Sequence, residues 1–149
     1  MWRGPFEPGE SVHLDRAEAL RRAASADHAV LATLERSRGA DLVPVCFAIQ
    51  GDSVAVPIDS VKPKGSTALG RVRNLARDPR ATLLAEHWDA DDWSRLWWVR
   101  LSLRRFVVDG ATLAALERIL RDRYPQYRDA PFSEVLTFRI EAVSGWSAS

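Results

Sequence analysis

The chain has 149 residues, a mass of 16.7 kDa and a formal net charge of +1. Hydrophobic residues make up 46% and charged residues 28%, which is typical of a globular chain with a sizeable core and not of a disordered one. No apolar run approaches the roughly 18 residues of a membrane helix, and the near-neutral charge favours neither a membrane nor a nucleic-acid partner. A single cysteine rules out an internal disulfide, and the N-terminus lacks a secretory signal, so we expect a cytoplasmic protein.

The chain is expected to form one domain over residues 1–149. Residues 1–12 hold two Pro and two Gly without periodicity, which favours a loose N-terminal arm. Asp15, followed by Glu18 three residues later, is typical of a helix start. The apolar spacing that follows predicts a helix ending near Ser25.

Three apolar segments come next, at 28–34, 42–49 and 53–58, and short turns separate them. Consecutive strands joined in this way favour an antiparallel sheet. The second segment is apolar on both faces, which predicts burial on both sides, in a barrel or under a partner subunit. Pro44 removes a ladder donor and predicts an edge strand or an irregularity there.

Residues 67–77 have the spacing of a helix, which Asp78 and Pro79 should end. The predicted core face of this helix comprises Leu69, Val72, Leu75 and Ala76. The predicted opposite face comprises Arg73, Asn74 and Arg77, with Arg71 at its flank. The remaining predicted elements are strands at 81–85, 96–108 and 135–143 and a helix at 112–123. About six antiparallel strands with two or three helices predict a mainly β (α+β) fold, a small β-barrel with helical decoration.

The segment 62–80 carries six cations and one acid, a local charge of +5 on a nearly neutral chain. Such a concentration indicates an anionic ligand. Lys62, Lys64 and Arg71 can supply charge-assisted hydrogen bonds, and Ser66 and Thr67 stand at the predicted helix start, where backbone amides attract anions. The spacing is not that of a P-loop. A phosphate site is one interpretation; a solvated basic helix and a nucleic-acid patch are the alternatives.

Tryptophan gives a second signal, because four of the six lie between Trp88 and Trp98. Indoles can stack on a planar ligand, but they also dominate cores and interfaces. Trp97 and Trp98 are neighbours on a predicted strand and should point to opposite faces, so either role is open for them. The nearby His87 and its acidic neighbours have no recognisable ligand spacing, so we expect no metal. No G-x-S-x-G nucleophile motif occurs.

Several motifs together resemble a known family. They are Lys62-Pro63-Lys64, Arg73-Asn74, Asp78-Pro79-Arg80, the run at 92–100, Tyr124-Pro125-Gln126-Tyr127 and residues 144–148. The chain is similar, over nearly all of its length after residue 13, to the pyridoxamine 5′-phosphate oxidase-like split-barrel superfamily and, within it, to the deazaflavin-dependent branch. The resemblance implies an FMN-binding type of split β-barrel that forms a homodimer with cofactor sites at the subunit seam.

The resemblance also implies the site and the chemistry. The residues implied to hold the cofactor's phosphate end are Lys62, Lys64, Ser66, Thr67, Arg71 and Asn74, and Trp93 and Trp97 should lie near its ring. The implied cofactor is coenzyme F420, whose polyanionic tail would suit the basic segment, and the implied reaction transfers a hydride between F420 and an unknown unsaturated small molecule. FMN in the same fold, or a non-catalytic protein that binds a cofactor or tetrapyrrole, are the alternatives. The proton donor is open among Tyr124, Tyr127, His87 and His28.

Overall fold

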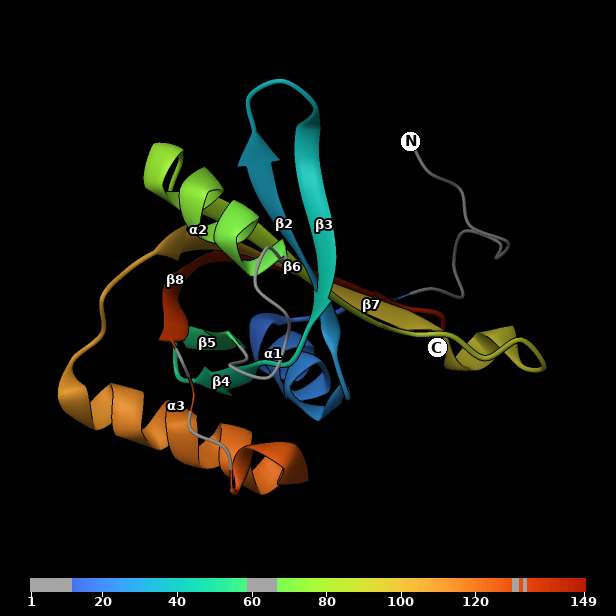
Figure 1. Cartoon of the computed structure of the whole chain (residues 1–149). Helices are drawn as coiled ribbons and strands as arrows, with labels where there is room; N and C mark the ends of the chain where they lie inside the picture. The colour runs from blue at the N-terminus through green and yellow to red at the C-terminus, as the bar shows by residue number, and fades with distance from the viewer. Residues whose placement is uncertain (1–11, 59–66, 130–131, 133) are drawn as a thin grey trace.

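The computed structural model describes residues 12–58, 67–129, 132 and 134–149, and Figure 1 shows their arrangement. In this part of the chain eight strands form one antiparallel sheet in the order β3-β2-β6-β7-β8-β5-β4, with β1 paired to β8. The strands are β1 (Val12–His13), β2 (Ala29–Glu35), β3 (Gly39–Val45), β4 (Ala48–Gln50), β5 (Ser53–Ile58), β6 (Arg80–His87), β7 (Trp97–Arg105) and β8 (Glu134–Ser147). The predicted mainly β fold with helices is confirmed.

The strand count is higher than the predicted six, for two local reasons. Val12, the last residue of the predicted loose arm, begins the short strand β1, and the rest of that arm lies outside the described residues. The predicted strand at 42–49 is divided, because Phe47 makes no ladder bonds: its N–H donates to the Tyr124 hydroxyl (3.3 Å) and its carbonyl accepts from Arg123 (3.2 Å). Pro44 lies on β3, which ends the strand order, so its predicted edge position is confirmed.

Helix α1 (Arg16–Ser25) covers one face of β7 and β8. Its start is capped as predicted, since the Asp15 carboxylate accepts from the Glu18 N–H at 2.8 Å. The approach to β8 is close at Gly145, where an added Cβ would lie 3.3 Å from the Ala19 Cβ. Glycine at this position therefore permits the helix and the strand to pack together.

Helix α3 (Gly110–Arg123) packs against β4 and β5, as Figure 1 shows at the lower edge of the molecule. Leu116 and Leu120 are fully buried there, against Ala48 and Ala55. A 3-10 turn, η2 (Pro125–Tyr127), continues from the helix and adds Tyr127 to the same apolar cluster. This cluster is separate from the main core, which fills the space inside the sheet.

Over β3, β2 and β6, one face of the sheet carries apolar side chains that are open to solvent in the single chain. Leu42 of β3 is 68% exposed and Leu84 of β6 is 38% exposed. Cross-strand pairs join these residues through β2, because Ala32 lies opposite Leu42 and Val30 opposite Leu84. The predicted burial of the second strand on both sides is therefore not met within one chain. We call the surface formed by Val30, Ala32, Leu42 and Leu84 the outer face. No helix in the described ranges is long and apolar enough to cross a membrane.

Candidate functional site

The basic segment is described only from its helix onward. Lys62, Lys64 and Ser66 lie outside the described residues, and so does the side chain of Thr67, the first residue of helix α2 (Thr67–Arg77). The helix has the predicted bounds and packs on β2. Its remaining candidate residues, Arg71 and Asn74, are both described.

The buried side of α2 differs from the prediction. Asn74, expected on the outer side, is 3% exposed, and Arg71 is 8% exposed, whereas Ala76 is exposed. Arg71 stands three residues before Asn74 and four before Leu75, so the helical period places all three on the side that meets the sheet. The apolar spacing wrongly placed Ala76 on the core face, because a short, uncharged alanine is compatible with both exposed and buried positions.

Asn74 joins the helix to the β2–β3 hairpin. Its amide nitrogen donates to the Thr33 hydroxyl at 3.0 Å and to an Asp41 carboxylate oxygen at 2.9 Å. Bonds from Arg38 and Asn74 hold the pKa of Asp41 below its ordinary value. Asn74 thus fixes α2 on the sheet and thereby fixes the position of Arg71.

Arg71 is the described cation best placed to hold an anion. Its guanidinium stays charged at any physiological pH and offers a planar set of donors that matches phosphate or carboxylate. Because the side chain is buried, its charge is screened less than that of exposed Arg73 and Arg77 on the same helix. The chemistry of this side chain fits the phosphate end of a cofactor.

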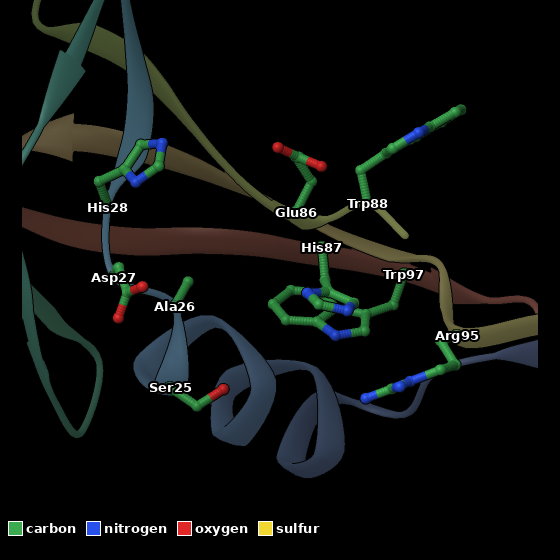
Figure 2. Close-up of a pocket in the computed structure, with 9 residues that line it drawn as sticks. All are labelled: Ser25, Ala26, Asp27, His28, Glu86, His87, Trp88, Arg95 and Trp97. Carbon is green, nitrogen blue, oxygen red and sulfur yellow. The ribbon is translucent and has the colours of Figure 1, made fainter. Parts of the chain in front are cut away.

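A pocket of about 470 Å³ lies at the other end of β2 and β6, where the two strands part (Figure 2). Their pairing stops at Val30 and Leu84, whereas β6 continues to His87 along β7. The end of α1, the link between α1 and β2, the end of β6, the 3-10 turn η1 (Trp93–Arg95) and the start of β7 surround the opening. The pocket is lined by Ser25, Ala26, Asp27, His28, Glu86, His87, Trp88, Arg95 and Trp97.

Flat rings form one wall of this pocket. The His87 imidazole stacks on the Trp97 indole with centroids 6.4 Å apart and planes 20° apart. Trp93 lies outside the lining; it is 42% exposed and its ring is tilted against Trp88 at 6.1 Å. The structure therefore brings Trp97 into the pocket and leaves Trp93 at its periphery.

Helix α3 fixes the opposite wall. Arg123 donates to the carbonyls of Ala26 and Phe47, and the Tyr124 hydroxyl donates to the Asp27 carbonyl at 3.0 Å. Burial raises the pKa of Tyr124, so this hydroxyl keeps its proton. Sequence reasoning missed the wall at residues 25–27, because no local motif indicates that a helix 97 residues away would hold it. In the described ranges no three His, Cys, Asp or Glu residues gather as a metal site.

No protein-family model matches the chain, and no curated protein matches its sequence. Its structure is similar to an FAD-binding protein of Mesorhizobium loti, with a TM-score of 0.67 and 13% identity over 93% of this chain and 99% of that one. A Corynebacterium glutamicum protein, assigned provisionally as a pyridoxamine 5′-phosphate oxidase, gives a TM-score of 0.56 and 15% identity over 91% and 96% of the two chains. A heme-binding protein of Mycobacterium smegmatis gives 0.64 and 22% over 97% of this chain and 56% of that one.

These similarities show the fold alone, a split β-barrel that this chain shares with the matched proteins. The predicted fold class is thereby confirmed.

Proposed function

We propose that the protein is an oxidoreductase that transfers a hydride between coenzyme F420 and an unsaturated small molecule in the cytoplasm. The observation that carries this proposal is the buried Arg71 on a helix that lies within the segment 62–80, whose local charge is +5. A buried guanidinium beside several further cations is suited to a ligand with more than one negative group. The fold, shared with an FAD-binding protein and a provisional pyridoxamine 5′-phosphate oxidase, favours a flavin-type cofactor.

The charge of the basic segment favours F420 over FMN. FMN carries one phosphate, whereas the F420 tail carries a phosphodiester and several carboxylates. Lys62, Lys64, Ser66 and Thr67 would join Arg71 at this tail, and Asn74 would hold the helix that presents it. The bound cofactor would supply the hydride chemistry, while the protein binds, orients and excludes water. FMN in the same position is the alternative.

The test is a fluorescence titration of the purified protein with F420, repeated in the presence of FMN. We expect saturable F420 binding that FMN does not displace. Displacement of F420 by FMN, or binding of FMN alone, would favour the alternative that the protein uses FMN. If neither binds, the basic segment is a surface helix or a nucleic-acid patch, and the proposal is wrong.

The proposal includes a second copy of the chain. Apolar side chains from β2, β3 and β6 lie side by side on the outer face, and a contiguous exposed apolar surface of this kind marks an interaction site. The face borders the pocket, because Glu86 lies two residues after Leu84 on β6 and therefore on the same face of the sheet. In Figure 2 Glu86 and Trp88 both point away from the side on which His87 lies. A homodimer formed through this face would complete the site at its seam.

We expect Leu84→Glu to convert the dimer into a monomer, because a carboxylate would be buried at the seam without a partner. The matched control is Val107→Glu, which places the same charge on a residue that is 81% exposed and lies after β7, off this face. Light scattering after size-exclusion chromatography gives the masses. A wild-type monomer, or a dimeric Leu84→Glu variant, would contradict the outer-face dimer.

A non-catalytic heme- or tetrapyrrole-binding protein is a second candidate. It is favoured by the two pocket histidines, His28 and His87, since imidazole is a common heme ligand, and by the fold shared with a heme-binding protein. Tight heme binding seen in the Soret band, without hydride transfer from reduced F420, would support this candidate over the first.

A further inference from the structure

The four candidate proton donors lie in two different places in the structure. Tyr124 and Tyr127 belong to the α3 cluster, where their rings pack edge to face at 5.9 Å. The Tyr124 hydroxyl is engaged with the Asp27 carbonyl, and Tyr127 is only 9% exposed. Neither tyrosine lines the pocket, whereas His28 and His87 both do.

The two histidines occupy different sides of the pocket. In Figure 2 the His87 ring lies over Trp97, whereas the His28 side chain comes from the α1–β2 link, just before β2, and points away from that pair. His87 is held more firmly, because its backbone pairs with Trp97 across β6 and β7 and its ring stacks on the same residue. A ring that is fixed in this way presents its nitrogens in a defined direction.

The surroundings of His87 suit a flat, polar molecule. The stacked rings offer a planar wall, and residues 85–87 of β6 extend beyond the last β2 pair, so one backbone edge faces the opening. The volume of about 470 Å³ lies within the range of small-molecule sites, roughly 300–1,000 Å³. The charged and titratable groups that line the pocket around the ring are Asp27 and His28 from the α1–β2 link, Glu86 from β6 and Arg95 from η1. The Arg95 guanidinium forms an ion pair with Asp89 at 3.5 Å.

We propose that this pocket receives the unsaturated acceptor and that His87 donates the proton that completes its reduction. This inference rests on the proposed function, which supplies a reduced deazaflavin as the hydride donor. In a conjugated ketone the β-carbon accepts the hydride, the C=C electrons move to form an enolate, and the α-carbon or oxygen takes a proton from the imidazolium form of His87, which becomes neutral imidazole. The acceptor gains two electrons and two hydrogens, the cofactor is oxidised, and exposed His87 regains its proton from solvent.

The first test measures turnover of 2-cyclohexen-1-one by the full chain with reduced F420 between pH 5 and 9. We expect His87→Gln to lower kcat by about 100-fold or more, the usual effect of losing a general acid. We expect the wild-type rate to fall as the pH rises, because a general acid must carry its proton, and we expect this fall to be absent in His87→Gln, since glutamine is not an acid in this range. F420 affinity should be unchanged, since His87 lies outside the basic segment.

Two histidine controls separate this role from a general effect. His13→Gln, at an exposed position on β1 outside the pocket, should leave kcat and the pH profile as in the wild type. His28→Gln should raise KM for the ketone without removing the pH dependence. A His87→Gln variant with wild-type kcat and an unchanged pH profile would overturn the proton-donor role.

A binding measurement keeps the pocket assignment testable without turnover. The chain has three histidines, so their imidazole Cε1–H resonances can be assigned with the three variants. Addition of 2-cyclohexen-1-one should shift the His87 resonance and leave that of His13 in place. A shift at His87 without F420 binding in the titration would support the pocket while refuting the proposed function; no shift at His87 would overturn the pocket assignment.

Discussion

Arg71→Ala is expected to weaken F420 binding by about 1.5–3 kcal/mol, which is roughly a 10- to 150-fold rise in Kd. The side chain is 8% exposed on the face of α2 that meets the sheet, where a charge-assisted hydrogen bond to the cofactor's anionic end is screened little by water. Fluorescence titration of the variant against the wild type measures the change.

Arg73→Ala is the matched control for this prediction. It removes the same charge from the same helix, two residues away, but Arg73 is exposed. We expect Arg73→Ala to change F420 affinity much less, and urea unfolding of both variants will show whether Arg71→Ala also loosens the helix. Equal, small effects of the two substitutions would mean that the cofactor responds to the overall charge of the segment and that Arg71 has no direct contact.

Arg123→Met is expected to lower the free energy of unfolding by about 2–3 kcal/mol, because it removes the charged donor shared by two distant segments. The guanidinium donates to the carbonyls of Ala26 and Phe47, and it lies 5.2 Å from the Phe47 ring centroid. Methionine keeps much of the apolar stem but leaves both carbonyls without this donor. Urea denaturation followed by tryptophan fluorescence gives the difference.

The control for Arg123→Met is Arg121→Met on the same helix. Arg121 faces Glu117 at 3.6 Å in a partly exposed pair and lies 4.8 Å from the Phe132 ring centroid; contacts of these two kinds at exposed positions contribute about 0–1 kcal/mol each. If the two variants are equally stable, Arg123 does not join α3 to the pocket wall. If Arg123→Met is destabilised as expected, its affinity for 2-cyclohexen-1-one should fall too, because residues 26–28 lose their support.

Helices α1 and α2 could be predicted well, because their sequence signals lie within a few residues of the helix ends. Asp15 caps α1 as its spacing with Glu18 indicates, and α2 has the bounds that its apolar period and the following Asp78-Pro79 predict. The division of the predicted strand at 42–49 could not be predicted in the same way. It depends on Arg123 and Tyr124, whose bonds to Phe47 exist only after α3 has packed on the sheet.

The candidate site shows the same difference. The basic segment and the group of tryptophans are visible in the sequence, and they indicated a site for an anionic, ring-bearing ligand. The orientation of the side chains could not be predicted. Asn74 points toward the sheet because Thr33 and Asp41 of the β2–β3 hairpin accept its hydrogen bonds. Trp93 and Trp97 lie apart because Trp93 belongs to the 3-10 turn η1 and Trp97 to the strand that follows it. Lys62, Lys64 and Ser66, outside the described residues, stay predictions.

The sequence by itself determined the six main strand segments, the starts of α1 and α2 and the location of the charge, since propensity, capping and charge act over a few residues. Helix α3 starts at Gly110, two residues before its predicted start. Only the tertiary structure decided which face of α2 is buried, where β2 and β6 part to form a pocket, and that His87 and Trp97 share its wall. Those features arise from strand pairing between residues far apart in the chain, such as Val30 with Leu84. The residue pair at which the β2–β6 ladder ends is determined by how the surrounding elements pack, and that packing depends on the whole fold.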